Sequence, residues 1–188
     1  MPQTIPRNLL VLLQKLDEHL AGEDRTELLV GGAGALLLAY DGQLATGDVD
    51  FIGERTGVLL ELSELAAKNS EIHRLTDYYV DIVPPGWFPN APGWLGRAVE
   101  VHVAGLTHID LRVLELHDLI LSKLKRFGSG DREDIRSLCD RPELDVDTLR
   151  KRYEQARQPY DHDEREQLDK NFQLVEVEFL AQKPSNFD

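Results

Sequence analysis

The spacing of apolar residues changes near residue 114, and this change limits the folds that the chain can adopt. Before residue 114, several short segments alternate apolar and polar residues, as "DVDFIG" and "YYVDIV" do, which is typical of β-strands. After it, apolar residues recur at the spacing of amphipathic helices. Strands followed by helices indicate an α+β fold with a helical C-terminal part. We expect the boundary between the two parts at residues 114 and 115.

Turn signals divide the two parts into individual elements. The segment "GWFPNAPGW" is expected as a loop whose Trp87, Phe88 and Trp94 stack a base, bind a partner or anchor the loop in the core. Strands are expected at 27–32, 48–53 and 78–83 and, around Gly105, in an antiparallel hairpin of 97–105 and 107–116. Helices are expected at 7–20, 33–40, 58–69, 117–127, 132–139, 146–156 and 165–182, the last capped by Asp161 or Asp163.

Composition excludes several classes of protein. The 188 residues are 41% hydrophobic and 29% charged, which indicates a folded globular chain. No apolar run reaches the roughly 20 residues that a membrane-spanning helix needs. The net charge of −13 argues against extended DNA binding, because non-specific affinity for nucleic acid comes mainly from Lys and Arg. A single cysteine, Cys139, and a first segment unlike a secretory signal predict a cytoplasmic protein.

Gly31 and Gly32 end an apolar strand and lead directly into the apolar segment 33–40. A dinucleotide-binding G-x-G-x-x-G would need a third glycine where Leu37 stands, and the chain has no Gly-Lys-Ser/Thr of a Walker loop. A strand that turns into a helix at two glycines presents free backbone N–H groups and the positive end of the helix dipole. The pair is therefore either a phosphate-binding turn or a tight turn required by close packing.

Asp48 and Asp50 lie two positions apart on an expected strand and therefore share one of its faces, while Val49 and Phe51 face the core. Two neighbouring carboxylates can hold divalent ions, and Mg²⁺ binds through a few carboxylates and substrate phosphates. Alternatively, both side chains are simply solvated at a strand end. Asp81, flanked by apolar residues of another strand, is either a third carboxylate of the same site or an exposed residue of an edge strand.

Two segments together resemble the polymerase β-like nucleotidyltransferase superfamily: "VGGAGALLLAYDGQLATGDVDFIG" and "LELHDLILSKLKRFGSGDREDIRSL". More narrowly, they resemble small bacterial nucleotidyltransferases akin to the AbiEii-type toxin family. Those proteins pair a Gly-Gly/Thr-x-Asp-x-Asp segment with a later Asp-Leu-Ile-x-x-Lys-Leu helix and an Asp-x-x-Asp segment. The resemblance implies a mixed β-sheet flanked by helices in residues 1–114, including the N-terminal helix, and a helical part in residues 115–188 packed on that core.

The resemblance also implies roles for individual residues. Independently of it, Lys123 falls on the apolar face of its expected helix, where a lysine needs an anionic partner or must extend to solvent. Asp131 is alternatively the N-cap of its helix, with Asp134 in the first turn. The implied roles are nucleotide binding for Gly31, Gly32, Thr46, Lys123, Asp131 and Asp134, metal binding for Asp48, Asp50 and Asp81, and catalysis for Asp48, Asp50 and Lys123.

Taken together, these residues predict a nucleotidyltransferase that uses two Mg²⁺ ions to transfer a nucleoside monophosphate from an NTP to a hydroxyl acceptor. The acceptor is an RNA end, a protein or a small molecule, and the setting is toxin–antitoxin or phage defence. Two departures from the superfamily pattern favour an alternative function. Ala33 stands where many members have serine, and Leu44 where relatives often have a basic residue. The alternative is a weak or inactive nucleotidyltransferase-fold module that binds a cognate partner protein.

A second cluster of polar residues suggests a metal-dependent phosphohydrolase, because a His-Asp pair with further His and Asp residues can bind metal. Its members are His102, His108, Asp110, His117 and Asp118. Strand alternation places His108 and Asp110 together on one polar face, so we expect both to be solvated rather than to bind metal.

Overall fold

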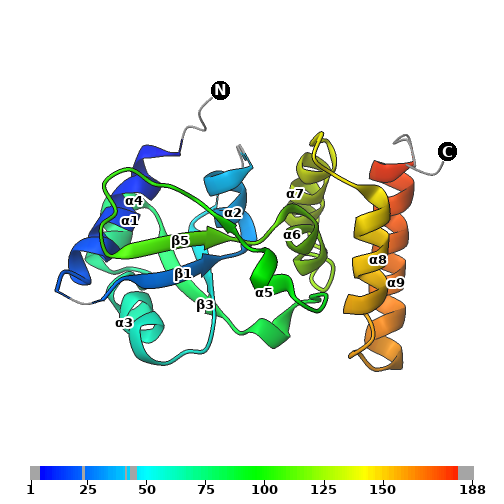
Figure 1. Ribbon diagram of the computed structural model, residues 1–188, viewed down its shortest axis with the longest axis horizontal. Helices are drawn as coiled ribbons and strands as arrows, with labels where there is room; N and C mark the ends of the chain where they lie inside the picture. The colour runs from blue at the N-terminus through cyan, green and yellow to red at the C-terminus, as the bar shows by residue number, and fades with distance from the viewer. Residues whose placement is uncertain (1–4, 23, 41, 43–45, 182–188) are drawn as a thin grey trace. The chain divides into compact units, whose positions relative to one another are not determined.

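The computed structural model (Figure 1) describes residues 5–22, 24–40, 42 and 46–181 of the chain. The chain divides into two compact units. The first comprises Met1–Trp87 and Ala98–Leu114, and the second comprises Phe88–Arg97 and Glu115–Asp188. Within the described ranges, every helix is too short or too polar to cross a bilayer.

A five-stranded sheet forms the centre of the first unit. Strand β1 runs parallel to β5 and β2 runs parallel to β3, whereas the pairs β1–β2 and β4–β5 are antiparallel. The sheet is therefore mixed, and the hairpin predicted around Gly105 is the β4–β5 pair. The strands are β1 (Thr26–Val30), β2 (Asp48–Ile52), β3 (Tyr79–Val83), β4 (Val99–Glu100) and β5 (Ile109–Val113), in the order β3-β2-β1-β5-β4.

The two faces of the sheet differ in chemistry. On one face, Val49 and Phe51 of β2 are completely buried. On the other face, Asp48 and Asp50 alternate with them and are only half-buried. The parallel register places Asp81 of β3 beside Asp50 on this second face. One face thus belongs to the core of the first unit, and the other carries carboxylates.

Helix α2 packs on the apolar face of the sheet. Helix α2 lies so close to the sheet that a Cβ atom added at Gly34 would be 3.1 Å from Val30 Cγ1 and 3.4 Å from Val49 Cγ1. Helix α1 buries an apolar stripe at helical spacing, in which Leu9, Leu12, Leu13 and Leu16 are completely buried. The helices are α1 (Arg7–His19), α2 (Gly32–Ala39), α3 (Gly57–Leu65) and α4 (Glu71–Thr76), with the 3-10 turn η1 (Pro85–Trp87) after β3.

The second unit is helical. Figure 1 shows α8 and α9 side by side, and between them the rings of Tyr153 and Phe172 stack with centroids 3.9 Å apart. Asp161 is the N-cap of α9 and accepts a 3.0 Å hydrogen bond from the Glu164 N–H, as one of the two predicted caps. The α+β fold with a helical C-terminal part is therefore confirmed. The elements are α5 (Trp94–Arg97), α6 (Leu116–Ser122), α7 (Ser129–Cys139), α8 (Val146–Ala156), α9 (His162–Val175) and the π-helical segment η2 (Glu176–Leu180).

Candidate functional site

The acidic face of β2 and β3 gathers three of the predicted carboxylates. Asp50 and Asp81 are direct neighbours in the parallel register, and Asp48 is paired with Tyr79 one step along the same face. Burial and the negative charges of Asp48, Asp81 and Asp50 raise the pKa of Tyr79. All three carboxylates therefore act electrostatically on one tyrosine.

The glycine turn lies directly against this face. The Gly31 N–H donates a 2.9 Å hydrogen bond to the Asp50 carbonyl, which joins the end of β1 to β2. Gly32 has a φ of +56°, and a Cβ atom added there would be only 1.9 Å from Asp50 Oδ2. Glycine is required at this position for two reasons, the backbone conformation and the space taken by the Asp50 carboxylate. The structure therefore brings the predicted glycines and Asp50 together.

The same turn begins helix α2, which has Gly31 as its N-cap. The first intrahelical bond runs from the Ala35 N–H to the Gly31 carbonyl, at 3.0 Å. The N–H groups of the first turn, which include those of Gly32 and Ala33, precede this bond and can bind an anion from the positive end of the helix dipole. A helix N-terminus whose N–H groups can bind an anion therefore lies beside a carboxylate pair.

Thr46 positions Asp48. Its hydroxyl donates to Asp48 Oδ1 and also lies 3.4 Å from the Asp48 N–H, just before β2 begins. Of the two departures from the superfamily pattern, Ala33 is half-buried in the first turn of α2. Leu44 lies outside the described residues.

The third carboxylate, Asp81, is engaged elsewhere. Its Oδ1 accepts a 3.2 Å bond from Arg55 Nη2 and a 2.8 Å bond from the Ile82 N–H. No group of three or more His, Cys, Asp or Glu side chains is arranged to hold a metal ion anywhere in the described ranges. The donor set that fits Mg²⁺ is therefore the pair Asp48 and Asp50, since this ion is commonly bound by one or two carboxylates with substrate phosphates and waters as the other ligands.

The predicted residues of the second unit form a buried ionic cluster. Lys123, at the C-cap of α6, is 4% exposed, and its ammonium donates to Asp134, which is 5% exposed. The predicted need for an anionic partner is met by Asp134, and the alternative in which Lys123 extends to solvent is wrong. An interior lysine cannot remain charged at low cost without such a partner.

Asp131 takes part in the N-terminal cap of α7, but it is not the N-cap residue itself. The N-cap is Gly128, whose N–H donates a 3.0 Å bond to Asp131 Oδ2 from three positions upstream. Burial alone would raise the pKa of Asp131, but hydrogen bonds from Arg126 and Gly128 outweigh it and lower that pKa. The N-cap assignment of Asp131 is therefore wrong by one turn, and Asp134 lies in the second turn of α7 rather than the first.

Two residues near the carboxylates were not predicted, namely Tyr79 and Arg55. Strand alternation could have identified Tyr79, because it lies two positions before Asp81 and so on the same face. Arg55 follows β2 in an irregular segment, where periodicity carries no information about which way a side chain points.

The phosphohydrolase cluster is not assembled as a metal site. Asp110 is bound by Arg25 Nε at 3.0 Å, and Asp118 is bound by Arg97 at 2.8 and 2.9 Å. His117 is buried, with Nδ1 2.7 Å from Glu115 and Nε2 accepting a 3.0 Å bond from a backbone N–H. Arginines, a backbone N–H and Glu115 thus satisfy these three side chains.

The loop aromatics behave in two ways. Phe88 and Trp94 are buried in the second unit and meet edge to face, with centroids 5.6 Å apart. Trp87 is 69% exposed. Core anchoring is therefore confirmed for two of the three rings.

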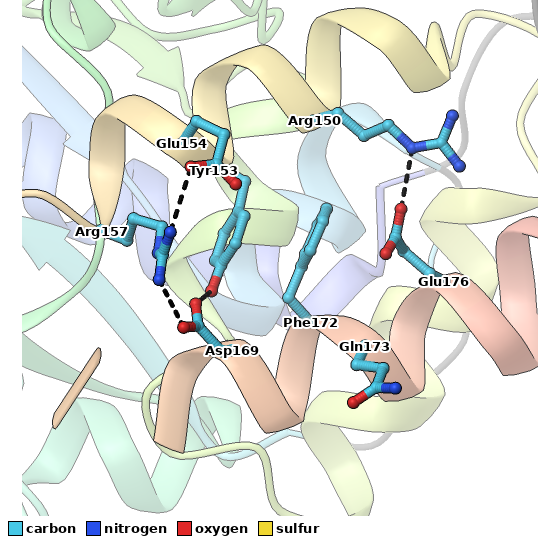
Figure 2. A pocket seen from close by; sticks show the side chains of 8 residues that line it. All are labelled: Arg150, Tyr153, Glu154, Arg157, Asp169, Phe172, Gln173 and Glu176. Atoms are coloured by element: carbon cyan, nitrogen blue, oxygen red, sulfur yellow. Dashed lines mark hydrogen bonds and ion pairs between the residues drawn. The ribbon is translucent and has the colours of Figure 1, made fainter. Parts of the chain in front are cut away.

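A cavity of about 320 Å³ lies in the second unit, and Figure 2 shows the side chains of α8, α9 and η2 that line it. Each of its arginines is already paired, Arg150 with Glu176 at 2.8 Å and Arg157 with Asp169. The cavity contains none of the predicted site residues, and its three carboxylates outnumber its two arginines, so it does not favour an anionic nucleotide. It is lined by Arg150, Tyr153, Glu154, Arg157, Asp169, Phe172, Gln173 and Glu176.

A family model described as "Nucleotidyltransferase of unknown function (DUF6036)" matches residues 7–180 of the chain. This range includes both groups of predicted site residues. Among curated proteins and solved structures, none matches the chain significantly.

Proposed function

Since the chain belongs to this nucleotidyltransferase family of unknown function, we propose that it transfers a nucleoside monophosphate from an NTP to a hydroxyl acceptor. The acceptor hydroxyl releases its proton to solvent as its oxygen attacks the α-phosphorus. The bond from the α-phosphorus to the oxygen that bridges it to the β-phosphorus breaks, and pyrophosphate leaves with the electron pair. The observation that carries the proposal is the contact between Gly32 and the Asp50 carboxylate. A phosphate-binding helix start and a cation-binding strand are useful together only if the ligand carries both phosphate and metal.

In this proposal Asp48 and Asp50 would hold Mg²⁺, with two ions expected from the chemistry of the superfamily. Bound Mg²⁺ would neutralise the triphosphate and lower the pKa of the acceptor hydroxyl. The chain itself supplies the remaining functions. Thr46 orients Asp48, and the N–H groups of the first turn of α2 bind the phosphate oxygens on which charge develops as pyrophosphate leaves.

Lys123, Asp131 and Asp134 enter the proposal through the resemblance. Lys123 would contact the triphosphate, with Asp131 and Asp134 as further parts of the nucleotide site. Because the Lys123 ammonium is bonded to Asp134, this contact requires that the pair open when the nucleotide binds. A role of these three residues in nucleotide binding therefore depends on the opening of the Lys123–Asp134 ion pair.

The acceptor is proposed to be an RNA end, a protein side chain or a small molecule. The net charge of −13 disfavours a long polyanionic acceptor, because such an acceptor must be bound through many positive charges. We place the reaction in the cytoplasm and in a toxin–antitoxin or phage-defence setting, on the basis of the resemblance to AbiEii-type proteins.

A second candidate function rests on Ala33. This residue lies in the first turn of α2 and lacks the hydroxyl that a serine would offer to a phosphate. A nucleotidyltransferase-fold module with weak or lost activity, which binds a cognate partner protein, would not need that hydroxyl.

Incubation with labelled NTPs and Mg²⁺ tests the proposal. Wild-type protein should bind and transfer label, and Asp48→Asn and Asp50→Asn should each lower Mg²⁺-dependent NTP binding by roughly 100-fold or more. Asp77→Asn is the matched control, because Asp77 is exposed and its φ of 62° suits asparagine. Binding that is unchanged in both site variants would exclude this site, whereas binding without transfer by the wild type would favour the binding module.

A further inference from the structure

Asp81 lies in the right place for a third carboxylate but is held by a cation of the chain itself. Its backbone is paired with that of Asp50, and neighbouring parallel strands lie about 4.8 Å apart. Nevertheless, the described residues contain no assembled group of three acidic ligands. Both the Arg55 bond and the Ile82 N–H bond fall on Oδ1 of Asp81. Arg55 therefore supplies the positive charge that a bound metal ion would otherwise supply to the Asp81 carboxylate.

We propose that Arg55 is an exchangeable counterion of the site, and this inference rests on the proposed function. In the absence of nucleotide, Arg55 pairs with Asp81. When a metal–triphosphate binds, Arg55 transfers to a phosphate oxygen, and Asp81 is released to act beside Asp48 and Asp50. Arg55 is thus a positioning residue that makes the third carboxylate available only when the substrate is present.

The exposure of the pair permits this exchange. The side chains of Arg55 and Asp81 are 62% and 53% exposed, so their ion pair is weak and screened by solvent. A triphosphate offers a denser negative charge than one carboxylate, and the planar guanidinium binds phosphate oxygens in a bidentate manner. The Ile82 N–H bond keeps the Asp81 carboxylate in place after Arg55 leaves.

Other cations of the first unit are less suited to this role. Lys68 Nζ lies 5.6 Å from the centre of the Tyr79 ring, a contact with an aromatic face rather than with a carboxylate. Arg74 of α4 donates to the Asn69 carbonyl at 2.8 Å. Among these three cations, Arg55 is the one bonded to a predicted metal ligand.

Mn²⁺ binding without nucleotide tests the first half of the proposal, because Mn²⁺ shares the preference of Mg²⁺ for oxygen ligands and can be followed by electron paramagnetic resonance. Arg55→Gln should bind Mn²⁺ about two- to fivefold more tightly than wild type, as expected for removal of an exposed competing ion pair. The gain should vanish when Asp81→Asn is added. Arg74→Gln, which removes the same charge from another exposed position of the first unit, should bind Mn²⁺ as wild type does.

Inorganic tripolyphosphate with Mn²⁺ tests the second half. Here Arg55→Gln should bind about tenfold more weakly than wild type, because a charge-assisted hydrogen bond to phosphate is lost. The variant should therefore have opposite effects on the two ligands, which a purely structural role of Arg55 would not produce.

The outcomes separate this inference from the proposed function. If Asp48→Asn lowers Mn²⁺ binding while Arg55→Gln matches wild type with both ligands, the exchange is overturned and the metal site stands. If Arg55→Gln improves Mn²⁺ binding but leaves tripolyphosphate binding unchanged, transfer to the phosphate is overturned. If Asp48→Asn leaves Mn²⁺ binding unchanged, the proposed function fails first and the role of Arg55 fails with it.

Discussion

At Gly32 the backbone has a φ of +56°, and the carboxylate of Asp50 fills the space in which a side chain would begin. Two other glycines separate these effects. Gly57 has a φ of +51° but open space around its Cα, and Gly86 has open space without the positive φ. The three positions therefore form a natural series for measuring what the carboxylate adds to the requirement for glycine.

We expect Gly32→Ala to lower the free energy of unfolding by roughly 3 kcal/mol. This value is the sum of two costs, one for placing alanine in a left-handed backbone conformation and one for its steric clash with Asp50. Gly57→Ala should cost about 1 kcal/mol for the backbone alone, and Gly86→Ala should cost close to nothing. Urea denaturation gives all three values. Equal costs at Gly32 and Gly57 would contradict the close approach of Asp50.

Lys123 allows a second prediction at this scale. Lys123→Met should destabilise the protein by roughly 3 to 5 kcal/mol, because it leaves the Asp134 carboxylate buried without its cation. Adding Asp134→Leu should restore most of that loss, as measured by urea denaturation of the double variant. Lys125→Met is the control, since its pair with Glu164 is 42% and 45% exposed, and such pairs contribute about 0 to 1 kcal/mol. A large loss that Asp134→Leu does not repair would show that Lys123 stabilises the fold in another way.

The arrangement of individual residues was only partly predictable. That Asp48 and Asp50 share a face opposite Val49 and Phe51 follows from the period of a strand. That Asp81 pairs with Asp50 depends on the register between two strands, which is set by packing across the sheet rather than by local sequence. The contact between Gly32 and Asp50 likewise requires two separate segments to be placed in space.

At the scale of elements, α1 is joined to the start of β5 through a single carboxylate. Asp17 is 5% exposed and accepts backbone N–H bonds from Thr107, His108 and Ile109 at 2.8–3.0 Å. Burial would raise the pKa of Asp17, but these bonds and that of the Thr107 hydroxyl outweigh it and lower the pKa. The helix is thereby fixed to the sheet by an anion that serves three backbone donors.

Asp17→Asn should therefore destabilise the first unit by about 3 kcal/mol, because an amide replaces one accepting oxygen with a donor that faces other donors. The thermal midpoint of unfolding at neutral pH measures this loss. Glu18→Gln, the next residue, pairs with Lys15 on the surface and should change the midpoint little. If the two variants behave alike, Asp17 does not anchor α1.

Long elements were identified from the sequence more readily than short ones. The long stripe of α1 and the apolar helix α2 were found, whereas the six residues of α4 are too few to display a period. This helix is instead defined by its ends: the Ser70 hydroxyl accepts from the His73 N–H at 3.1 Å, and Asp77 closes it with a φ of 62°. The predicted strand at 97–105 was too long, since regular pairing in β4 covers only Val99–Glu100.

At the scale of the whole molecule, the free energy of unfolding should depend on pH because of the ionisation of Glu115. Burial would raise the pKa of Glu115, but the hydrogen bonds and charges of His117 and Arg152 outweigh it and lower the pKa to about 2. A carboxyl with a lowered pKa in the folded state stabilises the fold above its unfolded pKa of 4.5, and this contribution is lost as the pH falls toward 2. Its upper limit is about 3 kcal/mol.

The difference in unfolding free energy between wild type and Glu115→Gln should accordingly shrink by up to about 2.5 kcal/mol between pH 6 and pH 2.5. Urea denaturation across this range measures it. Glu166→Gln serves as control, because Glu166 and Lys170 are both more than half exposed, and its smaller effect should disappear in high salt. Parallel curves for wild type and Glu115→Gln would contradict the predicted role of Glu115.

The segment Phe88–Arg97 belongs to the second unit, although the stretches on both sides of it belong to the first. Arg97 holds the buried carboxylate of Asp118 through two bonds, and Phe88 packs on Trp94. A gene cut after residue 114 would therefore separate Asp118 from Arg97, one of its two cationic partners, and leave two aromatic rings without their surroundings. A single crossover at residue 114 therefore cannot exchange the helical unit intact between relatives.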